Sequence, residues 1–198
     1  MCTHATSDCG NIIGMAFAFQ HGESLAGLVL AASNGLLDPN FHRTLVYIAE
    51  HGPAGAVGLV MNRPINKTLG EVAESPELPD ALRGTPVFQG GPVRPTALLL
   101  ARFQRGRTDE ELRCQIVADP FELVEPRRRG WVRAFAGYAG WGEGQLEREL
   151  GERSWVVCRP HTALLEQPVP PAIWEAFVGE DQRWRKLIAL LPKFTGLN

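Results

Sequence analysis

Residues 43–64 have the sequence Arg-Thr-Leu-Val-Tyr-Ile-Ala-Glu-His-Gly-Pro-Ala-Gly-Ala-Val-Gly-Leu-Val-Met-Asn-Arg-Pro, and this stretch decides the fold. Two almost continuous apolar runs flank a short loop of His, Gly, Pro, Ala and Gly. Apolar runs rich in Val, Ile and Leu and bounded by turn residues are typical of strands buried on both faces. A loop of about five residues that contains glycine fits an antiparallel hairpin. Gly58 inside the second run predicts a bulge, a sharp coil or a close backbone approach.

The expected register gives this hairpin two chemically different ends. Pairing of Glu50 with Ala56 places Thr44 opposite Asn62. The open end then carries Arg43, Thr44, Asn62 and Arg63, and the loop end carries Glu50 and His51. Six residues at about 3.3 Å each separate the two ends by roughly 20 Å. A small-molecule site therefore uses one end or the other.

The bulk composition is typical of a soluble globular protein with one domain. A length of 198 residues is enough for a substantial core. The formal net charge of −2 gives no global attraction to nucleic acid or to an anionic membrane. Four scattered cysteines, Cys2, Cys9, Cys114 and Cys158, favour reduced thiols in a cytoplasmic protein over a disulfide framework. The N-terminus lacks the pattern of a signal peptide, and the apolar run 12–19 is too short to span a membrane.

We expect residues 1–23 to form a leader, mobile or loosely docked, ahead of a single α+β domain over residues 24–198. Cys2, His4, Asp8 and Cys9 lie within this leader. Their spacing is irregular, whereas a structural zinc site needs four ligands in a closed tetrahedron. We therefore predict no metal site.

Short strands with a few interleaved helices are predicted around the hairpin. Expected strands cover residues 25–32, 86–93, 97–101, 112–117, 131–138 and 154–158, with a helix from residue 127 as the alternative for 131–138. Expected helices cover residues 68–73, 145–150, 171–178 and 181–191, the first with a capping box of Thr68 and Glu71. This order predicts an α+β fold with a strongly coiled or barrel-like mixed sheet. It differs from the regular alternation of a doubly wound fold.

Several motifs occur in an order that is typical of one bacterial family. They are residues 27–31, Asp38-Pro39-Asn40-Phe41 with Arg43-Thr44, Glu50-His51, 55–64, 90–93, 137–142, 145–147 with Glu149, and Trp155. On these motifs the chain resembles the YqgE/AlgH (UPF0301) proteins. The resemblance implies a mixed, mostly antiparallel, bifurcated sheet rolled into a pseudo-barrel with flanking helices. It implies no established reaction and no catalytic residues, although one branch of the family carries a transcriptional-regulator label.

Two segments depart from the family pattern. The family usually has a Leu-His pair after the glycine turn, where this chain has Leu100-Ala101-Arg102. Any role of that histidine is therefore in doubt for this chain. Residues 192–198 also differ from the usual family ending.

The open end is the first candidate ligand site, for a small anionic ligand. Its predicted residues are Arg43, Asn62, Arg63, Gly90, Gly91 and Trp141. Arginine offers a planar fork of donors to carboxylate or phosphate, and glycine lets backbone amides approach a phosphate. In the alternative interpretation Arg43 pairs with a carboxylate such as Asp38, Asn62 closes a turn, and the glycines permit positive-φ turns. Neither the turn Gly90-Gly91-Pro92 nor the glycine-rich run from Gly137 to Gly144 matches a dinucleotide fingerprint or a P-loop.

The loop end is the alternative site. Glu50 and His51 would act as a general base or ligand contact near neutral pH. Adjacent side chains of an extended strand point to opposite faces, so the alternative is a histidine that bonds its own turn. Cys158, three residues before His161, fits a small core residue better than a nucleophile.

The sequence thus predicts a cytoplasmic, non-enzymatic regulatory or binding module without a cofactor. Its expected partner is a small anionic ligand or another protein, with no membrane contact. The alternatives are an enzyme with its site near Glu50 and His51, or a transcriptional regulator. Direct DNA binding is disfavoured, because the net charge is negative, no helix-turn-helix is recognisable and the one basic run is Arg127 to Arg129.

Overall fold

Nine strands of four to thirteen residues make up a strongly curved sheet in the computed structural model, which describes residues 24–73, 75–108, 110–124, 130–166 and 173–178. The predicted leader (1–23), the basic run 127–129 and the predicted helix 181–191 lie outside these residues. The strands are β1 (Val29–Ala32), β2 (Leu45–Gly52), β3 (Gly55–Val60), β4 (Pro64–Thr68), β5 (Pro86–Gln89), β6 (Val93–Arg105), β7 (Leu112–Val117), β8 (Trp131–Trp141) and β9 (Trp155–Cys158). The helices are α1 (Leu69–Val72), α2 (Asp80–Arg83), a 3₁₀ helix η1 (Pro120–Leu123), α3 (Gln145–Gly151), α4 (Thr162–Glu166) and α5 (Trp174–Val178).

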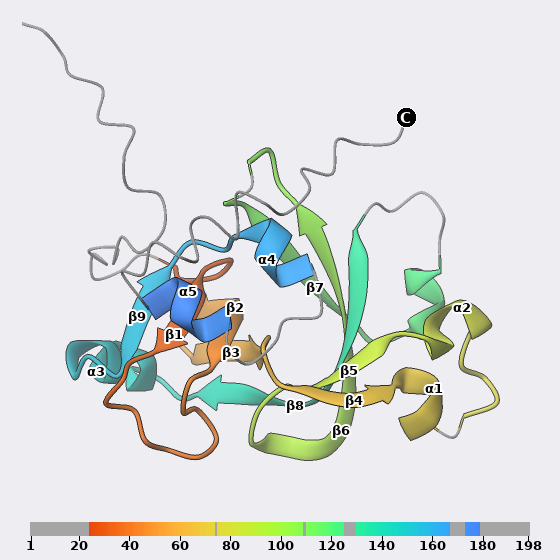
Figure 1. Cartoon of the computed structure of the whole chain (residues 1–198), viewed down its shortest axis with the longest axis horizontal. Coiled ribbons are helices and arrows are strands. Elements are labelled where there is room, and N and C mark those ends of the chain that lie inside the picture. Colours follow the sequence, from red (N-terminus) through yellow and green to blue (C-terminus); the bar gives the residue numbers. More distant parts are fainter. Residues whose placement is uncertain (1–23, 74, 109, 125–129, 167–172, 179–198) are drawn as a thin grey trace, which may run out of the picture.

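These described strands form one nine-stranded sheet that divides at β8. The main order is β4-β5-β8-β3-β2-β1-β9, and β6 pairs with both β8 and β7. All pairs are antiparallel except β5 with β8. Figure 1 shows the sheet curling, with α3 at one end and α1 and α2 at the other. The predicted α+β fold with a mixed, curled sheet is therefore confirmed.

Gly137 lies where β8 changes partners. Residues before it pair with β5 and β6, Tyr138 directly after it pairs with Val93 of β6, and residues 139–141 pair with β3. Its φ is +71°, and an added Cβ would lie 2.6 Å from the carbonyl oxygen of Gly91. Only glycine adopts this conformation without strain at such a close approach. The strand prediction for 131–138 is confirmed and the helical alternative is wrong.

The hairpin β2–β3 forms with the predicted register up to Ile48, which pairs with Gly58. A bulge then shifts the register, so Glu50 pairs with Val57 rather than with Ala56. The loop shrinks to the two-residue turn Pro53-Ala54. The expected five-residue loop and the pairing of Glu50 with Ala56 are thus wrong, because one extra residue is accommodated in β2. The bulge predicted from Gly58 is present, on the opposite strand.

The hairpin is buried on both faces, as its apolar runs predict. Leu45 and Tyr47 belong to the core cluster that also contains Phe88, Phe103 and Phe135. Val46 and Ile48, which alternate with them along β2, belong to a second cluster that also contains Trp141, Leu146 and Trp155. A third cluster lies beneath α1 and α2. Alternation along one strand thus supplies two cores.

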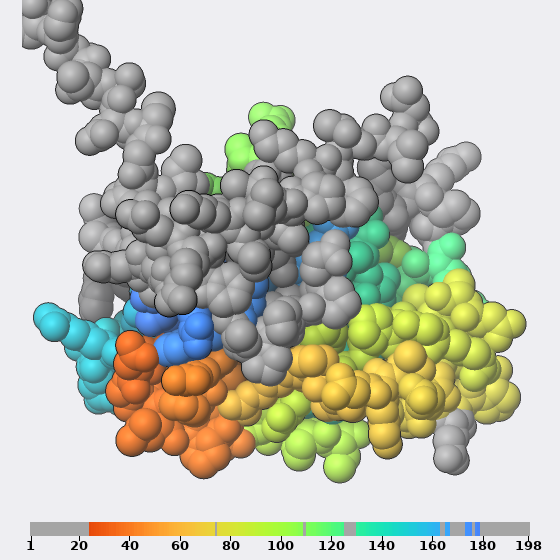
Figure 2. Space-filling model, in the orientation of Figure 1, coloured from red at the N-terminus to blue at the C-terminus, as the bar shows by residue number. Residues whose placement is uncertain are grey.

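The helices confirm part of the prediction. The carboxylate of Glu71 accepts a hydrogen bond from Thr68 N at 2.7 Å, which belongs to the predicted capping box, and a further one from Thr68 Oγ1 at 2.9 Å; both bonds lower the pKa of Glu71. Figure 2 shows α5 against the region of β1 and β2, where Trp174 Nε1 donates to the carbonyl oxygen of Ala32 at 2.7 Å. The strand β4 and the helix α2 were not predicted, since their sequences carry no clear periodicity.

Candidate functional site

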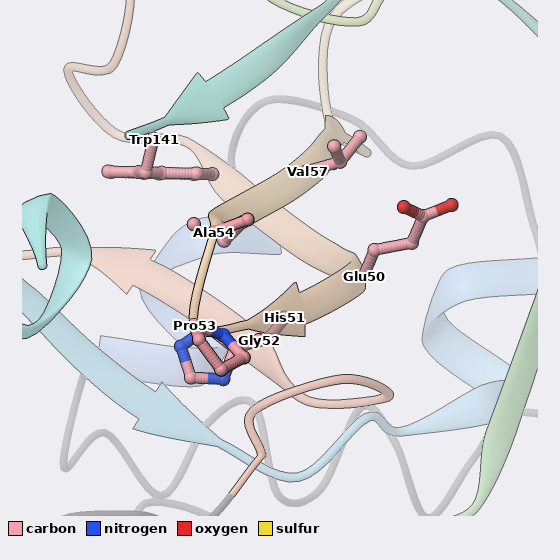
Figure 3. A pocket seen from close by; sticks show the side chains of 9 residues that line it. Glu50, His51, Gly52, Pro53, Ala54, Val57 and Trp141 are labelled. Atoms are coloured by element: carbon pink, nitrogen blue, oxygen red, sulfur yellow. The ribbon is translucent and has the colours of Figure 1, made fainter. Parts of the chain in front are cut away.

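A hollow of about 400 Å³ opens beside the turn of the hairpin (Figure 3). We call it the loop hollow; its lining residues are Glu50, His51, Gly52, Pro53, Ala54, Gly55, Ala56, Val57 and Trp141. Figure 3 shows the ring of Trp141 beside Ala54 and the carboxylate of Glu50 directed away from that ring, near Val57. The loop hollow thus joins an aromatic surface and small apolar side chains to one exposed carboxylate.

Trp141 reaches the hairpin because β8 pairs with β3, with Trp141 opposite Ala56. An added Cβ at Gly58 would lie 3.0 Å from Cζ3 of the indole and 2.5 Å from Val46 Cγ1. Glycine at position 58 therefore makes room for the aromatic wall of the loop hollow. Phe41 stacks on the indole with ring centroids 6.3 Å apart.

The indole of Trp141 is held by one carboxylate of α3. Its Nε1 donates to Glu149 Oε2 at 2.9 Å, and Nε1 of Trp155 donates to the same oxygen at 2.8 Å. Gln145 Nε2 donates to the other oxygen, Oε1, at 2.9 Å. Gln145 in turn accepts from the backbone N–H of Gly142 at 3.1 Å. This charge-assisted network fixes the wall of the loop hollow from behind.

His51 has both ring nitrogens engaged by the chain itself. The backbone N–H of Leu25 donates to Nδ1 at 3.0 Å, and Nε2 lies 2.9 Å from Glu147 Oε1. Because Nδ1 accepts a hydrogen bond, the proton of the neutral ring lies on Nε2 and is donated to Glu147. The side chain is only 7% exposed. These contacts favour a structural role for His51, because a general base needs a nitrogen that a substrate proton can reach.

The described thiols are poor nucleophiles. Burial, with a smaller contribution from the charge of Glu50, raises the pKa of Cys114 to about 12. Burial alone raises the pKa of Cys158 to about 12. Only the thiolate attacks an electrophile, so both side chains stay protonated and unreactive near neutral pH. Cys158 therefore packs as a core residue.

Asn62, at the open end, bridges two backbone groups of the hairpin. Its Oδ1 accepts from Leu45 N at 2.9 Å, and its Nδ2 donates to the carbonyl oxygen of Arg43 at 2.9 Å. The side chain is 1% exposed. Arg43 has a φ of +55°, and its guanidinium lies 5.5 Å from the centroid of the Trp174 ring. Asn62 thus joins the backbone of the two strands at the open end of the hairpin, which agrees with the alternative interpretation of this residue.

Arg63 donates its guanidinium hydrogens to the backbone of the preceding turn. Nη1 donates to the carbonyl oxygen of Asn40 at 2.9 Å. Nη2 donates to those of Pro39 at 3.0 Å and His42 at 3.1 Å. Burial lowers the pKa of Arg63, and Asp38 opposes that shift. The guanidinium hydrogens of Arg63 that could bind an anion are thus directed at backbone carbonyl oxygens.

Gly90 and Gly91 let three strands approach closely. Gly90 N donates to the carbonyl oxygen of Ala136, and Gly90 O accepts from Val60 N, each at 2.9 Å. An added Cβ at Gly91 would lie 2.2 Å from the carbonyl carbon of Tyr138. Of the six residues predicted for the open-end site, Trp141 lines the loop hollow and the other five do not. The structure therefore divides that set between two places.

A buried arginine of β8 was missed by the sequence analysis. Arg133 is 1% exposed, and its guanidinium lies 4.5 Å from the centroid of the Phe88 ring. It donates to the carbonyl oxygens of Leu165 and Met61. Burial lowers the pKa of Arg133 to about 9, and Glu166 opposes the shift. Trp131, Arg133 and Phe135 are two residues apart and therefore share one face of β8, and this pattern could have predicted that Arg133 is buried.

Two further properties limit the chemistry of the described residues. Within them, no three His, Cys, Asp or Glu side chains are grouped to hold a metal ion. No helix in the described ranges has the length and apolar character needed to cross a membrane.

Fold and site together define a curled, forked half-barrel of the α+β class with a hollow at one hairpin. A family model described as AlgH-like matches residues 28–183. The chain belongs to this AlgH-like, UPF0301 family, and the predicted membership is confirmed.

Several known proteins are similar to this chain. A UPF0301 protein of Streptomyces coelicolor is 35% identical over 189 residues, covering 88% of this chain and 96% of that protein. A UPF0301 protein of Nocardia farcinica is 38% identical over 191 residues, covering 88% and 86%. The solution structure of the AlgH protein from Pseudomonas aeruginosa matches with a TM-score of 0.64 at 29% identity, covering 86% of this chain and 97% of that one. A crystal structure from Corynebacterium diphtheriae, at 21% identity and a TM-score of 0.59 over 93% and 98%, shows the fold alone.

Proposed function

We propose that this protein is a non-enzymatic, cytoplasmic binding module with a regulatory role, and that it holds a segment of a partner protein in the loop hollow. The observation that carries the proposal is the hollow itself, whose lining is mainly apolar. The fully buried core of a protein interface is more apolar than the rest of the protein surface. A side chain of the partner would enter as an anchor, since buried anchors dominate the energy of protein interfaces.

The rigidity of the loop hollow supports this proposal. Glu149 fixes the indole of Trp141, and His51 ties the end of β2 to α3 through Glu147. Binding sites supported by packed elements and hydrogen-bond networks lose less conformational entropy when a partner binds. A preformed hollow of this kind suits recognition of a short segment.

Binding is favoured over catalysis by the state of the candidate reactive groups. Both nitrogens of His51 are engaged, and the pKa values of Cys114 and Cys158 are raised. The small number and irregular spacing of the four cysteines also support a cytoplasmic location. The formal net charge of −2 supports a protein partner over DNA. A small anion at the open end has less support, because Arg63 and Asn62 bind the backbone.

The test compares two chains that carry the same substitution at different places. Ala54 lines the loop hollow, whereas Ala81 is exposed in α2 and lies outside its lining. Proteins captured from a bacterial lysate by the unmodified chain are purified, and their dissociation constants are measured by calorimetry. Ala54→Asp is expected to weaken binding about tenfold or more, because a carboxylate loses hydration among apolar groups. Ala81→Asp is expected to bind as the unmodified chain does. Equal binding by both variants contradicts the proposal.

A further inference from the structure

The bulge in β2 determines where the carboxylate of Glu50 lies. Directly paired residues of antiparallel strands share one face of the sheet. Without the bulge Glu50 would pair with Ala56, whose side chain is buried in the core. With the bulge it pairs with Val57, and both residues line the loop hollow. Figure 3 shows the two side chains near each other, with the carboxylate directed away from the ring of Trp141. The extra residue in β2 thus brings a carboxylate to the apolar wall.

The carboxylate of Glu50 has no binding partner within the described part of the chain. Its side chain is exposed, and no hydrogen bond or ion pair of the described residues engages it. The neighbouring His51, in contrast, uses both ring nitrogens on its own chain. Glu149, on α3, uses both carboxylate oxygens in the same way. Glu50 is therefore the lining residue whose charged group remains available to a partner.

The lining of the loop hollow carries one formal charge, which is negative. It contains no lysine or arginine, and Glu50 is its one acidic residue. Two further carboxylates, Glu147 and Glu149, contact lining residues from α3. The charge of Glu50 also contributes to the raised pKa of Cys114 in β7, so its field extends into the domain. Charge of one sign beside walls of low dielectric constant attracts ligands of the opposite sign.

From this unpaired carboxylate, its apolar neighbour Val57 and the negative lining, we propose that the partner segment in the loop hollow carries a basic side chain beside its apolar anchor. The inference names the chemistry of the partner and rests on the proposed function. The stem of the basic side chain lies along Val57 and its charged end meets Glu50, since Lys and Arg bury an apolar stem and keep a polar end. Arginine is preferred to lysine, because its planar fork binds a carboxylate through two parallel hydrogen bonds.

The direct test measures the binding of defined peptides to the full-length, ¹⁵N-labelled protein by nuclear magnetic resonance. The probes are capped pentapeptides of glycine and serine with one leucine and, one to three positions later, arginine, lysine, glutamine or glutamate. Amide signals of Gly52, Gly55 and Val57 report contact with the hollow. The best arginine peptide is expected to bind about fivefold more tightly than its glutamine counterpart, the order of effect of a partly exposed ion pair. Equal dissociation constants, or no shift of these signals by any arginine peptide at up to about 10 mM, overturn the inference.

Charge variants assign the preference to one residue. Glu50→Gln is expected to remove the advantage of the arginine peptide, and Glu50→Lys to make the glutamate peptide the tightest binder. Glu77→Gln, which changes an exposed carboxylate outside the lining, is the matched control and should keep the advantage. In the unmodified chain the advantage should shrink when sodium chloride is raised from about 20 to about 500 mM, because salt screens exposed charges. An arginine advantage that survives Glu50→Gln overturns the inference.

A variant of unchanged charge separates this inference from the proposed function. Ala54→Asn places a polar side chain in the hollow and is expected to weaken every leucine peptide about fivefold, whereas Ala81→Asn is expected to weaken none. Peptides that depend on Ala54 but bind equally whatever their charge overturn the basic preference and leave the proposed function intact. An arginine preference that depends on Glu50, together with peptides and a captured partner that ignore substitutions of Ala54, supports the preference and contradicts the proposed binding site.

Discussion

The two ends of the β2–β3 hairpin differ in what their side chains contact. At the open end, Asn62 and Arg63 bind backbone groups of their own chain. At the loop end, apolar side chains and Trp141 surround a hollow. Polar residues that look suited to ligands thus hold the fold together, whereas the accessible site is mainly apolar. A polar motif is therefore a poor guide to a binding site when buried backbone groups nearby need partners.

The largest effect is expected from Asn62→Ala at the open end. The substitution leaves Leu45 N and the carbonyl oxygen of Arg43 without their buried partner, so the free energy of unfolding should fall by about 2–4 kcal/mol. Urea denaturation measures the loss. Asn40→Ala, at an exposed position, is the matched control, with an expected change within about 0.5 kcal/mol. Similar losses in both variants would show that the bridge is not structural.

The next effect concerns the support of the loop hollow. Glu149→Ala leaves the indole N–H groups of Trp141 and Trp155 without an acceptor. We expect a loss of about 1.5–3 kcal/mol and a change in tryptophan fluorescence, since partly buried donors lose their hydrogen bonds. Glu152→Ala, at an exposed position of α3's end, should change neither quantity. If Glu149→Ala changes neither the free energy of unfolding nor the tryptophan fluorescence, α3 does not support the wall of the hollow.

His51→Ala should cost less and act locally. Leu25 N loses its acceptor and Glu147 loses one hydrogen-bond donor, which corresponds to about 1–2 kcal/mol. Amide hydrogen exchange of residues 24–28 should accelerate, because this segment is tied to the hairpin through His51. His42→Ala, at an exposed position, should leave that exchange unchanged. Loss of a chemical activity with intact stability would instead revive the catalytic interpretation.

The smallest effect at neutral pH concerns the thiols. Folded Cys114 and Cys158 titrate near 12, whereas unfolded thiols ionise near 8.5. Above that lower pH the unfolded state binds fewer protons, so these groups reduce stability as the pH rises from about 8.5 to about 12. In a Cys2→Ser/Cys9→Ser chain, iodoacetamide at pH 8 should react slowly until denaturant is added. Rapid labelling of the native chain would contradict the burial of both thiols.

Sequence reasoning recovered local features better than contacts between distant segments. The apolar runs predict both strands and the pairing of Ile48 with Gly58, because these follow from side-chain alternation. The close approach of Gly58 to Trp141 joins residues that are distant in the chain, and no local pattern specifies the bulge beyond Ile48. The placement of Trp141 beside Ala54 depends on β3 pairing with β8, and no local pattern specifies that pairing. Asn62 illustrates the same difficulty, because one amide side chain suits either a ligand or two backbone groups.

One measurement tests directly whether the loop end, rather than the open end, is the binding site. The dissociation constant of a purified partner is measured in parallel for Ala54→Asp and Arg63→Ala, each at a temperature where both chains are folded. Ala54→Asp is expected to weaken binding about tenfold or more, and Arg63→Ala to change it less than about twofold. The reverse pattern, with Arg63→Ala losing the partner and Ala54→Asp retaining it, would mean that the partner binds at the open end.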